Sequence, residues 1–322
     1  LADSADKDIA GTLTLDGLTV AGNVSVDSGT IKLDGNYPTG TGNVALGDTA
    51  LDDGSLSGGY NVAVGHQALT ANTTGSNTAL GSYALVANTT GTANVAIGGF
   101  AASTSSALNA NTTGNYNVGV GTGALKSNTT ASNNTALGYQ AGYTNTTGQR
   151  IVAIGKGALY THNVTDASST NNVSVGYESS YSTTTGTDNT ALGSSTFYSN
   201  TTGSNNTALG RLALYSNTTG AVNVAVGQNA LYANTTGVAL TALGRQALKA
   251  NTTANYNVGL GAESLVVNTT GESNVAVGYS ALGANTTAGN NTAVGHQALL
   301  DNTTGAQNTS VGFRSLYNNT TA

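Results

Sequence analysis

The chain has 322 residues, a formal net charge of −6 and no cysteine, methionine or tryptophan, and only 7% of its residues are charged. This acidic balance offers no basic surface to neutralise phosphates, which argues against nucleic acid as a partner. The lack of cysteine excludes disulfides and thiolate chemistry. No apolar run approaches the ~20 residues of a membrane-spanning helix, so we expect no membrane insertion.

The sequence pattern of residues 1–42 differs from that of the rest of the chain. Short alternating segments such as Leu13-Thr14-Leu15 are separated by turn residues, and the segment ends near the only proline, Pro38. Strands this short need neighbours to pair with. We therefore predict a short-stranded β stem or adaptor over 1–42. Because the first residue is Leu1, we expect a mature product or part of a longer polypeptide.

Residues 43–322 form a tandem repeat whose period is most often seventeen residues. We align the repeats on the glycine of the motif Asn-(Val/Thr)-Ala-(aliphatic)-Gly and call it the anchor glycine. The anchors are Gly47, Gly65, Gly81, Gly98, Gly121, Gly138, Gly155, Gly176, Gly193, Gly210, Gly227, Gly244, Gly261, Gly278, Gly295 and Gly312. Extra residues fall in two places, Gly99 to Ala110 and Tyr160 to Asn171, which predicts surface loops on a stacked scaffold.

The five residues that end on the anchor glycine are predicted to be a strand. The residue before the anchor, the aliphatic position, is Leu, Val or Ile in every repeat, and the residue before that, the small position, is Ala, Gly or Ser. The two positions point to opposite sides of a strand. We expect the aliphatic side to face the chain's own coil. The small side is expected to lie against a second chain, since open solvent would tolerate larger polar residues there.

The rest of each repeat is predicted to be turns. A leucine usually stands four residues after the anchor, and the coil closes with Asn-Thr-Thr and usually Gly, whose first and last residues tolerate left-handed corners. These residues are poor helix formers. We predict an all-β, parallel β-solenoid (a β-roll) of about sixteen rungs, with asparagine and threonine ladders along its axis. A triple β-spiral remains an alternative.

One rung offers few core side chains, and a core this thin needs a staple, a metal or oligomerisation. Cysteine is absent, and so is a calcium-binding repeat of the Gly-Gly-x-Gly-x-Asp kind. We therefore expect a homotrimer with the small side as its seam, although the spacing does not fix the number of copies.

No pattern predicts catalysis, a cofactor or a metal site. There is no Gly-x-Ser-x-Gly motif and no Ser/His/Asp constellation. His66 and His296 are expected to be surface residues. An acidic cluster, Asp48, Asp52 and Asp53, could hold a hard cation, but a solvated cap on the end of the stack is the preferred interpretation.

Specific recognition is most expected in the two insertions, because loops on a rigid scaffold are where binding is usually added. The candidate residues are Phe100, Ser103, Ser106, Tyr160, His162 and Asp166. His162 is expected to be a loop residue. Five tyrosines recur just after the leucine position and are expected to pack along the side of the solenoid, with stacking on a glycan as the alternative: Tyr160, Tyr198, Tyr215, Tyr232 and Tyr317.

The motifs Asn-Val-Ala-Val-Gly and Asn-Thr-Ala-Leu-Gly, repeated with Ala-Leu and Asn-Thr-Thr-Gly over 43–322, resemble the repeats of bacteriophage tail fibres, especially those of marine cyanophages. The strand motif is also similar to that of trimeric autotransporter adhesin heads. The resemblance implies a stiff trimeric virion fibre outside the cell, without enzymatic activity. Its expected partners are copies of itself, other virion or baseplate proteins, and a host-surface glycan or protein. A bacterial cell-surface adhesin or filament subunit and an ice-binding solenoid are the alternatives.

Overall fold

The computed structural model describes residues 40–99, 105–165 and 169–321. The chain divides into two compact units, Leu1–Asp34 and Gly35–Ala322, and all described residues belong to the second. The predicted stem over 1–42 therefore lies outside the described residues, apart from its last three positions.

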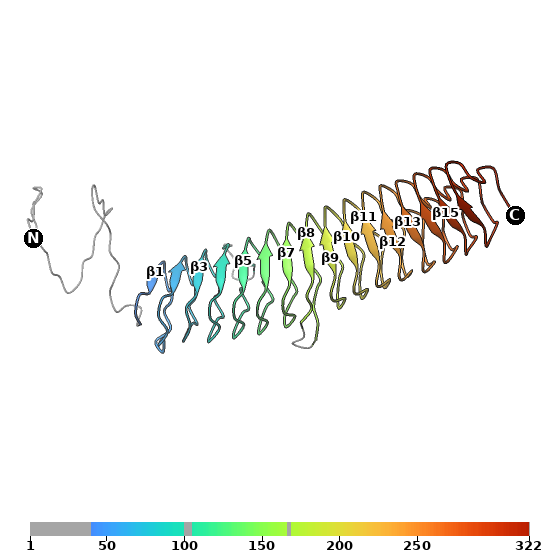
Figure 1. Cartoon of the computed structure of the whole chain (residues 1–322). Coiled ribbons are helices and arrows are strands. Elements are labelled where there is room, and N and C mark those ends of the chain that lie inside the picture. Colours follow the sequence, from blue (N-terminus) through green and yellow to red (C-terminus); the bar gives the residue numbers. More distant parts are fainter. Residues whose placement is uncertain (1–39, 100–104, 166–168, 322) are drawn as a thin grey trace, which may run out of the picture. The chain divides into compact units, whose positions relative to one another are not determined.

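The second unit is a β-solenoid in which sixteen strands stack into one parallel sheet in chain order (Figure 1). Each strand has three residues, two fewer than the sequence predicts. The strands are β1 (Val44–Leu46), β2 (Val62–Val64), β3 (Thr78–Leu80), β4 (Val95–Ile97), β5 (Val118–Val120), β6 (Thr135–Leu137), β7 (Val152–Ile154), β8 (Val173–Val175), β9 (Thr190–Leu192), β10 (Thr207–Leu209), β11 (Val224–Val226), β12 (Thr241–Leu243), β13 (Val258–Leu260), β14 (Val275–Val277), β15 (Thr292–Val294) and β16 (Thr309–Val311). No helix occurs among the described residues.

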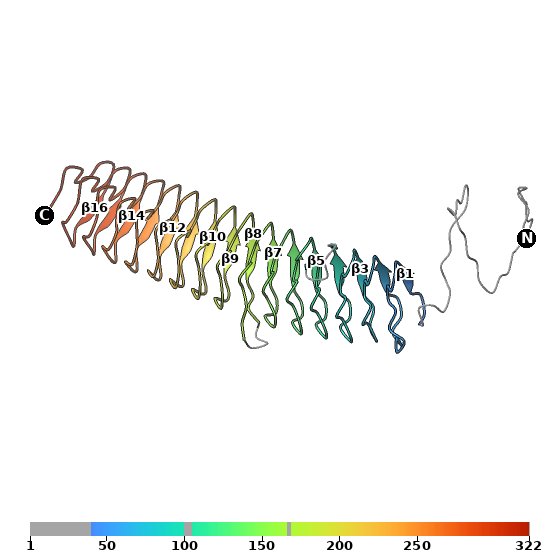
Figure 2. The same cartoon turned by 180° about the vertical axis from the view of Figure 1, so that it is seen from behind.

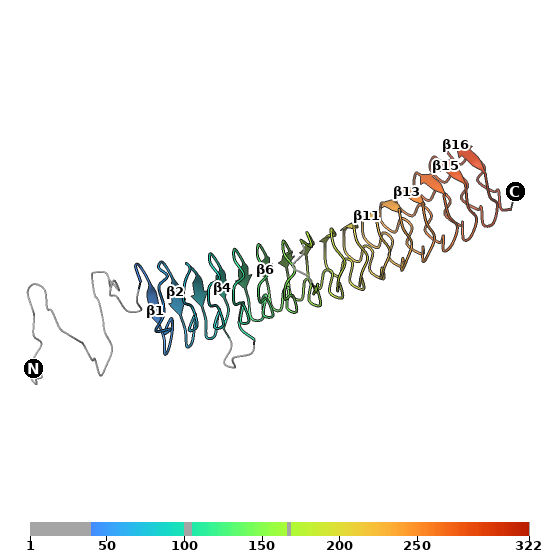
Figure 3. The same cartoon turned by 90° about the horizontal axis from the view of Figure 1, so that it is seen from below.

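Neighbouring rungs are in register, position for position. Thr207 of β10 pairs with Val224 of β11, and the two alanines that follow them pair in turn. The view from behind shows every strand running the same way across the coils (Figure 2), and the view from below shows the strands turning gradually along the stack (Figure 3). A parallel sheet within one chain is what a β-roll requires, whereas a triple β-spiral has antiparallel strands.

The sequence prediction that the aliphatic position faces the chain's own coil and the small position faces outward is wrong. The small position faces the interior, where Ala63 and Ala208 are fully buried, and the aliphatic position faces outward. The reason is the width of the coil. A Cβ built on Gly119 at the small position would lie 3.2 Å from the Leu108 side chain, so leucine from the turns already fills the space. A second aliphatic side chain would overpack it.

The anchor glycine makes the first corner of each rung. Gly210 has a φ of +123°, and a Cβ there would lie 2.8 Å from the carbonyl carbon of Gly227 in the next rung. Both the backbone conformation and the contact therefore require glycine. Leu214, four residues later, is also left-handed, with a φ of 51°. The coil needs this corner even at a residue that disfavours it.

Polar ladders run inside the solenoid parallel to its axis, as the repeat predicts. The Asn217 amide donates to Oδ1 of Asn200 one rung earlier at 3.1 Å and to the carbonyl of Gly220 at 3.0 Å. The Oγ1 of Thr218 donates to the carbonyl of Thr235 at 3.1 Å. We call the stacked first asparagines of the Asn-Thr-Thr corners the asparagine column. The ladders satisfy buried polar groups that would otherwise destabilise so thin a core.

Candidate interaction surfaces

The outward side of the sheet carries an unbroken column of aliphatic side chains beside a mixed column of Val and Thr. It consists of the first and third residues of β1 to β16, and we call it the aliphatic face. The first residues are all Val or Thr and the third are all Leu, Val or Ile. Leu80, Leu137 and Leu243 at the aliphatic position are 46%, 47% and 40% exposed. A continuous apolar strip of this kind is characteristic of a protein interaction surface.

A ladder of six stacked tyrosines lies along the turn side of the solenoid. Successive ring centroids are 4.9 to 5.3 Å apart and the rings are within 13° of parallel. The ladder consists of Tyr143, Tyr160, Tyr181, Tyr198, Tyr215 and Tyr232. Lys126 precedes it in the stack, with its Nζ 5.0 Å from the Tyr143 ring centroid. The expected packing of Tyr160, Tyr198, Tyr215 and Tyr232 along the side is thus present, and stacking leaves little ring face free for a glycan.

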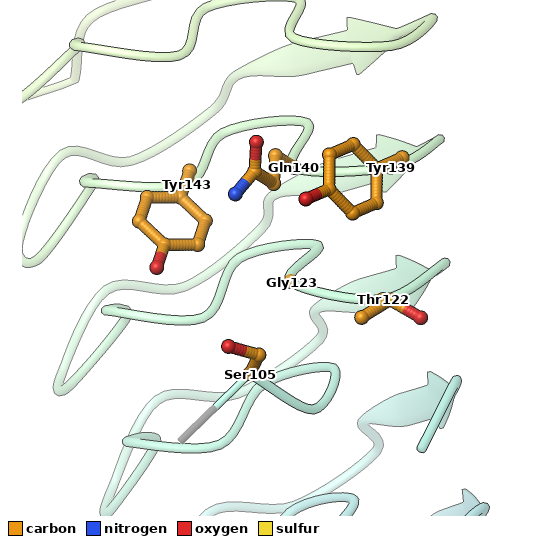
Figure 4. Close-up of a pocket in the computed structure, with 6 residues that line it drawn as sticks. All are labelled: Ser105, Thr122, Gly123, Tyr139, Gln140 and Tyr143. Carbon is orange, nitrogen blue, oxygen red and sulfur yellow. The ribbon is translucent and has the colours of Figure 1, made fainter. Parts of the chain in front are cut away.

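A small notch of about 70 Å³ lies at the start of the tyrosine ladder (Figure 4). Gly123 has no side chain to fill it, and a Cβ there would lie 3.2 Å from the Tyr143 ring. Tyr139 and Gln140 from the next rung, together with Thr122 and Ser105, complete the lining. The lining side chains are aromatic, hydroxyl and amide groups without charge, which suits a neutral polar ligand.

The structure separates the six candidate recognition residues. Phe100, Ser103 and Asp166 lie outside the described residues. Ser106 is fully buried and donates to the Ser82 carbonyl at 2.7 Å, so it belongs to the rung and not to an exposed loop. Tyr160 belongs to the tyrosine ladder, where burial is the main cause that raises its pKa.

His162 is fully buried, which corrects its prediction as a loop residue. It stands seven residues after Gly155, the place that Asn217 holds after Gly210, so it continues the asparagine column. The insertion begins later than the sequence alignment suggests. Counting forward from the anchor would have revealed this position.

The other polar candidates lie on the surface as cross-rung pairs. Nδ1 of His66 is 3.2 Å from Oδ2 of Asp48, and the His296 ring lies 5.3 Å from the Phe313 ring. Asp53 accepts hydrogen bonds from the Ser55 hydroxyl and backbone, which lower its pKa. No group of three or more metal-ligating His, Asp or Glu side chains occurs within 40–99, 105–165 and 169–321.

No protein-family model matches this sequence, and no curated protein matches it either. In the part of the chain that the structure describes, no helix is long and apolar enough to cross a membrane. What is shown is the fold class, a parallel β-solenoid built of tandem repeats.

Proposed function

We propose that this chain is the shaft of a homotrimeric fibre that projects from a virion and supports adsorption to the host surface. The observation that carries the proposal is the aliphatic face, which presents one column of Leu, Val and Ile and one column of Val and Thr over all sixteen strands of a weakly charged rod. Such a surface needs a partner of the same length and character. A second and third copy of the chain meet that requirement directly.

Burial of the aliphatic face would favour association. Its most exposed third-position side chains, Leu46, Leu80, Ile97, Leu137, Leu243 and Val311, are each at least 36% exposed and would each gain about 1 kcal/mol on burial. A closed cyclic assembly lets every copy cover its face in the same way. The proposed seam is therefore the aliphatic side of the sheet. The small side, expected from the sequence to be the seam, already packs against the chain's own leucines.

The proposed role of the fibre is distance and stiffness. Each rung is fixed to the next by the in-register sheet. Most rungs are also joined by the asparagine and threonine ladders, and six of them by stacked tyrosine rings. The resemblance to phage tail-fibre repeats supports a place on a virion, attached to baseplate or other virion proteins. The neutral, aromatic notch at Gly123 is the proposed place for contact with a host glycan or protein.

The oligomer is tested by light scattering coupled to size exclusion. We expect the wild-type chain to have the mass of three copies. Two lysines on the aliphatic face, L137K together with L243K, should give monomers, because burying unpaired charges is costly. The matched control adds two lysines at exposed positions outside the face, T219K together with Q228K, and should remain trimeric. A monomeric wild-type chain would exclude the proposal, and a dimer would exclude its threefold part.

The location is tested by immunogold labelling with an antibody against residues 43–322. Label on fibres that project from phage particles is the expected result. Label on the envelope of bacterial cells, with none on particles, would favour the adhesin alternative instead.

A further inference from the structure

Among the described residues, the buried apolar side chains form two separate clusters. One cluster of buried apolar side chains lies between residues 50 and 159 and a second between residues 191 and 299. The rung of β8 separates them. It carries Ser174 at the small position, and Ser179 and Ser180 where other rungs have alanine and leucine, and all three serines are buried.

The asparagine column is interrupted at the same place. Its order is Asn145, His162, Thr183 and Asn200, so two rungs lack the asparagine that links their neighbours. Oδ1 of Asn145 and both ring nitrogens of His162 are buried without a hydrogen-bond partner among the described residues. On the far side of the break, the Asn200 amide still donates to Oγ1 of Thr183 at 3.4 Å. Elsewhere the column is joined by bonds between asparagines, such as the 2.8 Å bond from Asn128 to Asn111. We call His162, Ser174, Ser179, Ser180 and Thr183 the polar break.

The serines of the polar break satisfy their hydroxyls but add no apolar contact between rungs. Oγ of Ser174 donates to Oγ of Ser180 at 2.6 Å, and Oγ of Ser179 donates to the carbonyl of Ala191 at 3.3 Å. In a stack where each rung contacts only its neighbours, stability is a sum of rung and interface contributions. Among the rungs that have a neighbour on both sides, the rung with the smallest apolar contribution is therefore the one that opens first.

His162 adds a dependence on pH. The residues stacked above and below it, Asn145 and Thr183, are uncharged, and no charged side chain of the described residues contributes to its pKa. Burial lowers the pKa of His162 to about 4, and the Thr184 backbone only partly opposes the shift, since neither ring nitrogen makes a hydrogen bond of normal geometry. Protonation would place an unpaired charge inside the coil, which strongly favours opening.

Two features compensate for the missing core. Phe197, the largest of the fully buried side chains, takes the leucine position of the rung that follows Ser180. On the outside, the tyrosine ladder crosses the polar break, with Tyr160 before it, Tyr181 on the β8 rung and Tyr198 after it. Phe197 in the following rung and the stacked tyrosines on the surface thus stabilise the polar break, whose own interior makes few apolar contacts.

We propose that the polar break is a joint at which the solenoid opens first, and that protonation of His162 opens it further. The two apolar blocks on either side stay folded while the β8 rung separates from its neighbours. The joint is a property of the single chain and does not depend on the fibre assignment.

Hydrogen exchange of the full-length chain tests this inference. The amides of Val173 and Ser180, which donate to the carbonyls of Asn189 and Thr196, are compared with those of Val224 and Leu214, which make the equivalent bonds away from the joint. We expect at least tenfold lower protection at the joint at pH 7. Between pH 7 and pH 5 its protection should fall by a further factor of about 20, as linkage predicts for a histidine whose pKa drops from 6.5 to about 4.

The variant H162N restores the asparagine of the column. It should make the joint's protection independent of pH, because the new amide can pair with Oδ1 of Asn145. The control H296N alters an exposed histidine and should keep the wild-type pH response. Equal protection at all four amides at both pH values would overturn the joint. An unchanged pH response in H162N would overturn the role of His162, and if H162N failed to fold, the wild-type pH series alone would still decide.

Discussion

The ring of Tyr160 stacks on the ring of Tyr181 with centroids 4.9 Å apart and planes within 3° of parallel, the closest contact of the tyrosine ladder. This pair joins the rungs of β7 and β8 at the point where the interior has lost its apolar side chains. At this point, ring stacking on the surface therefore provides a larger share of the stability than it does elsewhere in the ladder, because the core of the β8 rung provides less.

Replacing Tyr181 with alanine should lower stability more than replacing Tyr232, the last ring of the ladder. Tyr181 stacks on two rings and Tyr232 on one. At about 0.5–1.5 kcal/mol per aromatic pair, Y181A should cost about 1–3 kcal/mol beyond the loss of buried area and Y232A half of that. Urea unfolding followed by circular dichroism measures both. Equal losses would show that the ladder does not reinforce the joint.

Stability should fall as pH is lowered from about 6.5 to about 4. The folded pKa of His162 is depressed to about 4, so within this window the unfolded chain binds a proton that the folded chain does not. The loss is about 3 kcal/mol at pH 4 and levels off within about 0.5 kcal/mol of that value at lower pH. Urea midpoints of wild type and H162N across pH 4–7 isolate this contribution, because all other titrating groups are shared. Parallel curves for the two proteins would refute the assignment.

The variant G210A should be strongly destabilised, by about 3 kcal/mol or more. Its Cβ meets the backbone of Gly227, and its φ of +123° is unfavourable for any side chain. G54A is the matched control, since a Cβ at Gly54 meets nothing within 4 Å, and it should change stability by less than about 0.5 kcal/mol. Thermal melting of the two variants compares them, and similar melting temperatures would mean that the corner can relax.

Removing one member of the asparagine column should cost about 3 kcal/mol. N217A deletes the amide that donates to Asn200 and accepts from Asn234, and it leaves the buried Oδ1 of Asn200 unsatisfied, whereas the Gly220 carbonyl keeps its hydrogen bond from Asn206. T219A, two residues away and exposed, should be nearly neutral. The ratio of the two effects, measured by urea unfolding, reports how far the ladder stabilises the stack. A loss below 1 kcal/mol in N217A would indicate that water replaces the ladder.

The architecture was predictable because seventeen-residue periodicity fixes which residues meet. If Thr207 stacks beside Val224, every later position of the two repeats is matched as well, and parallel order follows. The alternation within a strand shows that Ala208 and Leu209 point to opposite sides. It does not show which side is inside, since that depends on the space left by leucines such as Leu214, whose left-handed backbone has no sequence signature.

The residues of the polar break are present in the sequence, but the repeat pattern alone does not predict the break. Ser174, Ser179 and Ser180 occupy positions that are apolar or small in neighbouring repeats, so each looked acceptable alone. Their effect depends on all three sharing one rung with Thr183, next to a histidine in the asparagine column. Only the stacked structure brings these residues into one layer.

Because each rung is in register with the next, the length of the solenoid is set by the number of repeats that the gene encodes. Deleting residues 207–223 would place Asn206 directly before Val224 and recreate the motif Asn-Val-Ala-Val-Gly, with each remaining rung still matched to its neighbour. The rod would shorten by one strand spacing, about 4.8 Å. Unequal recombination between repeats can therefore tune the reach of this protein in uniform steps without designing a new surface.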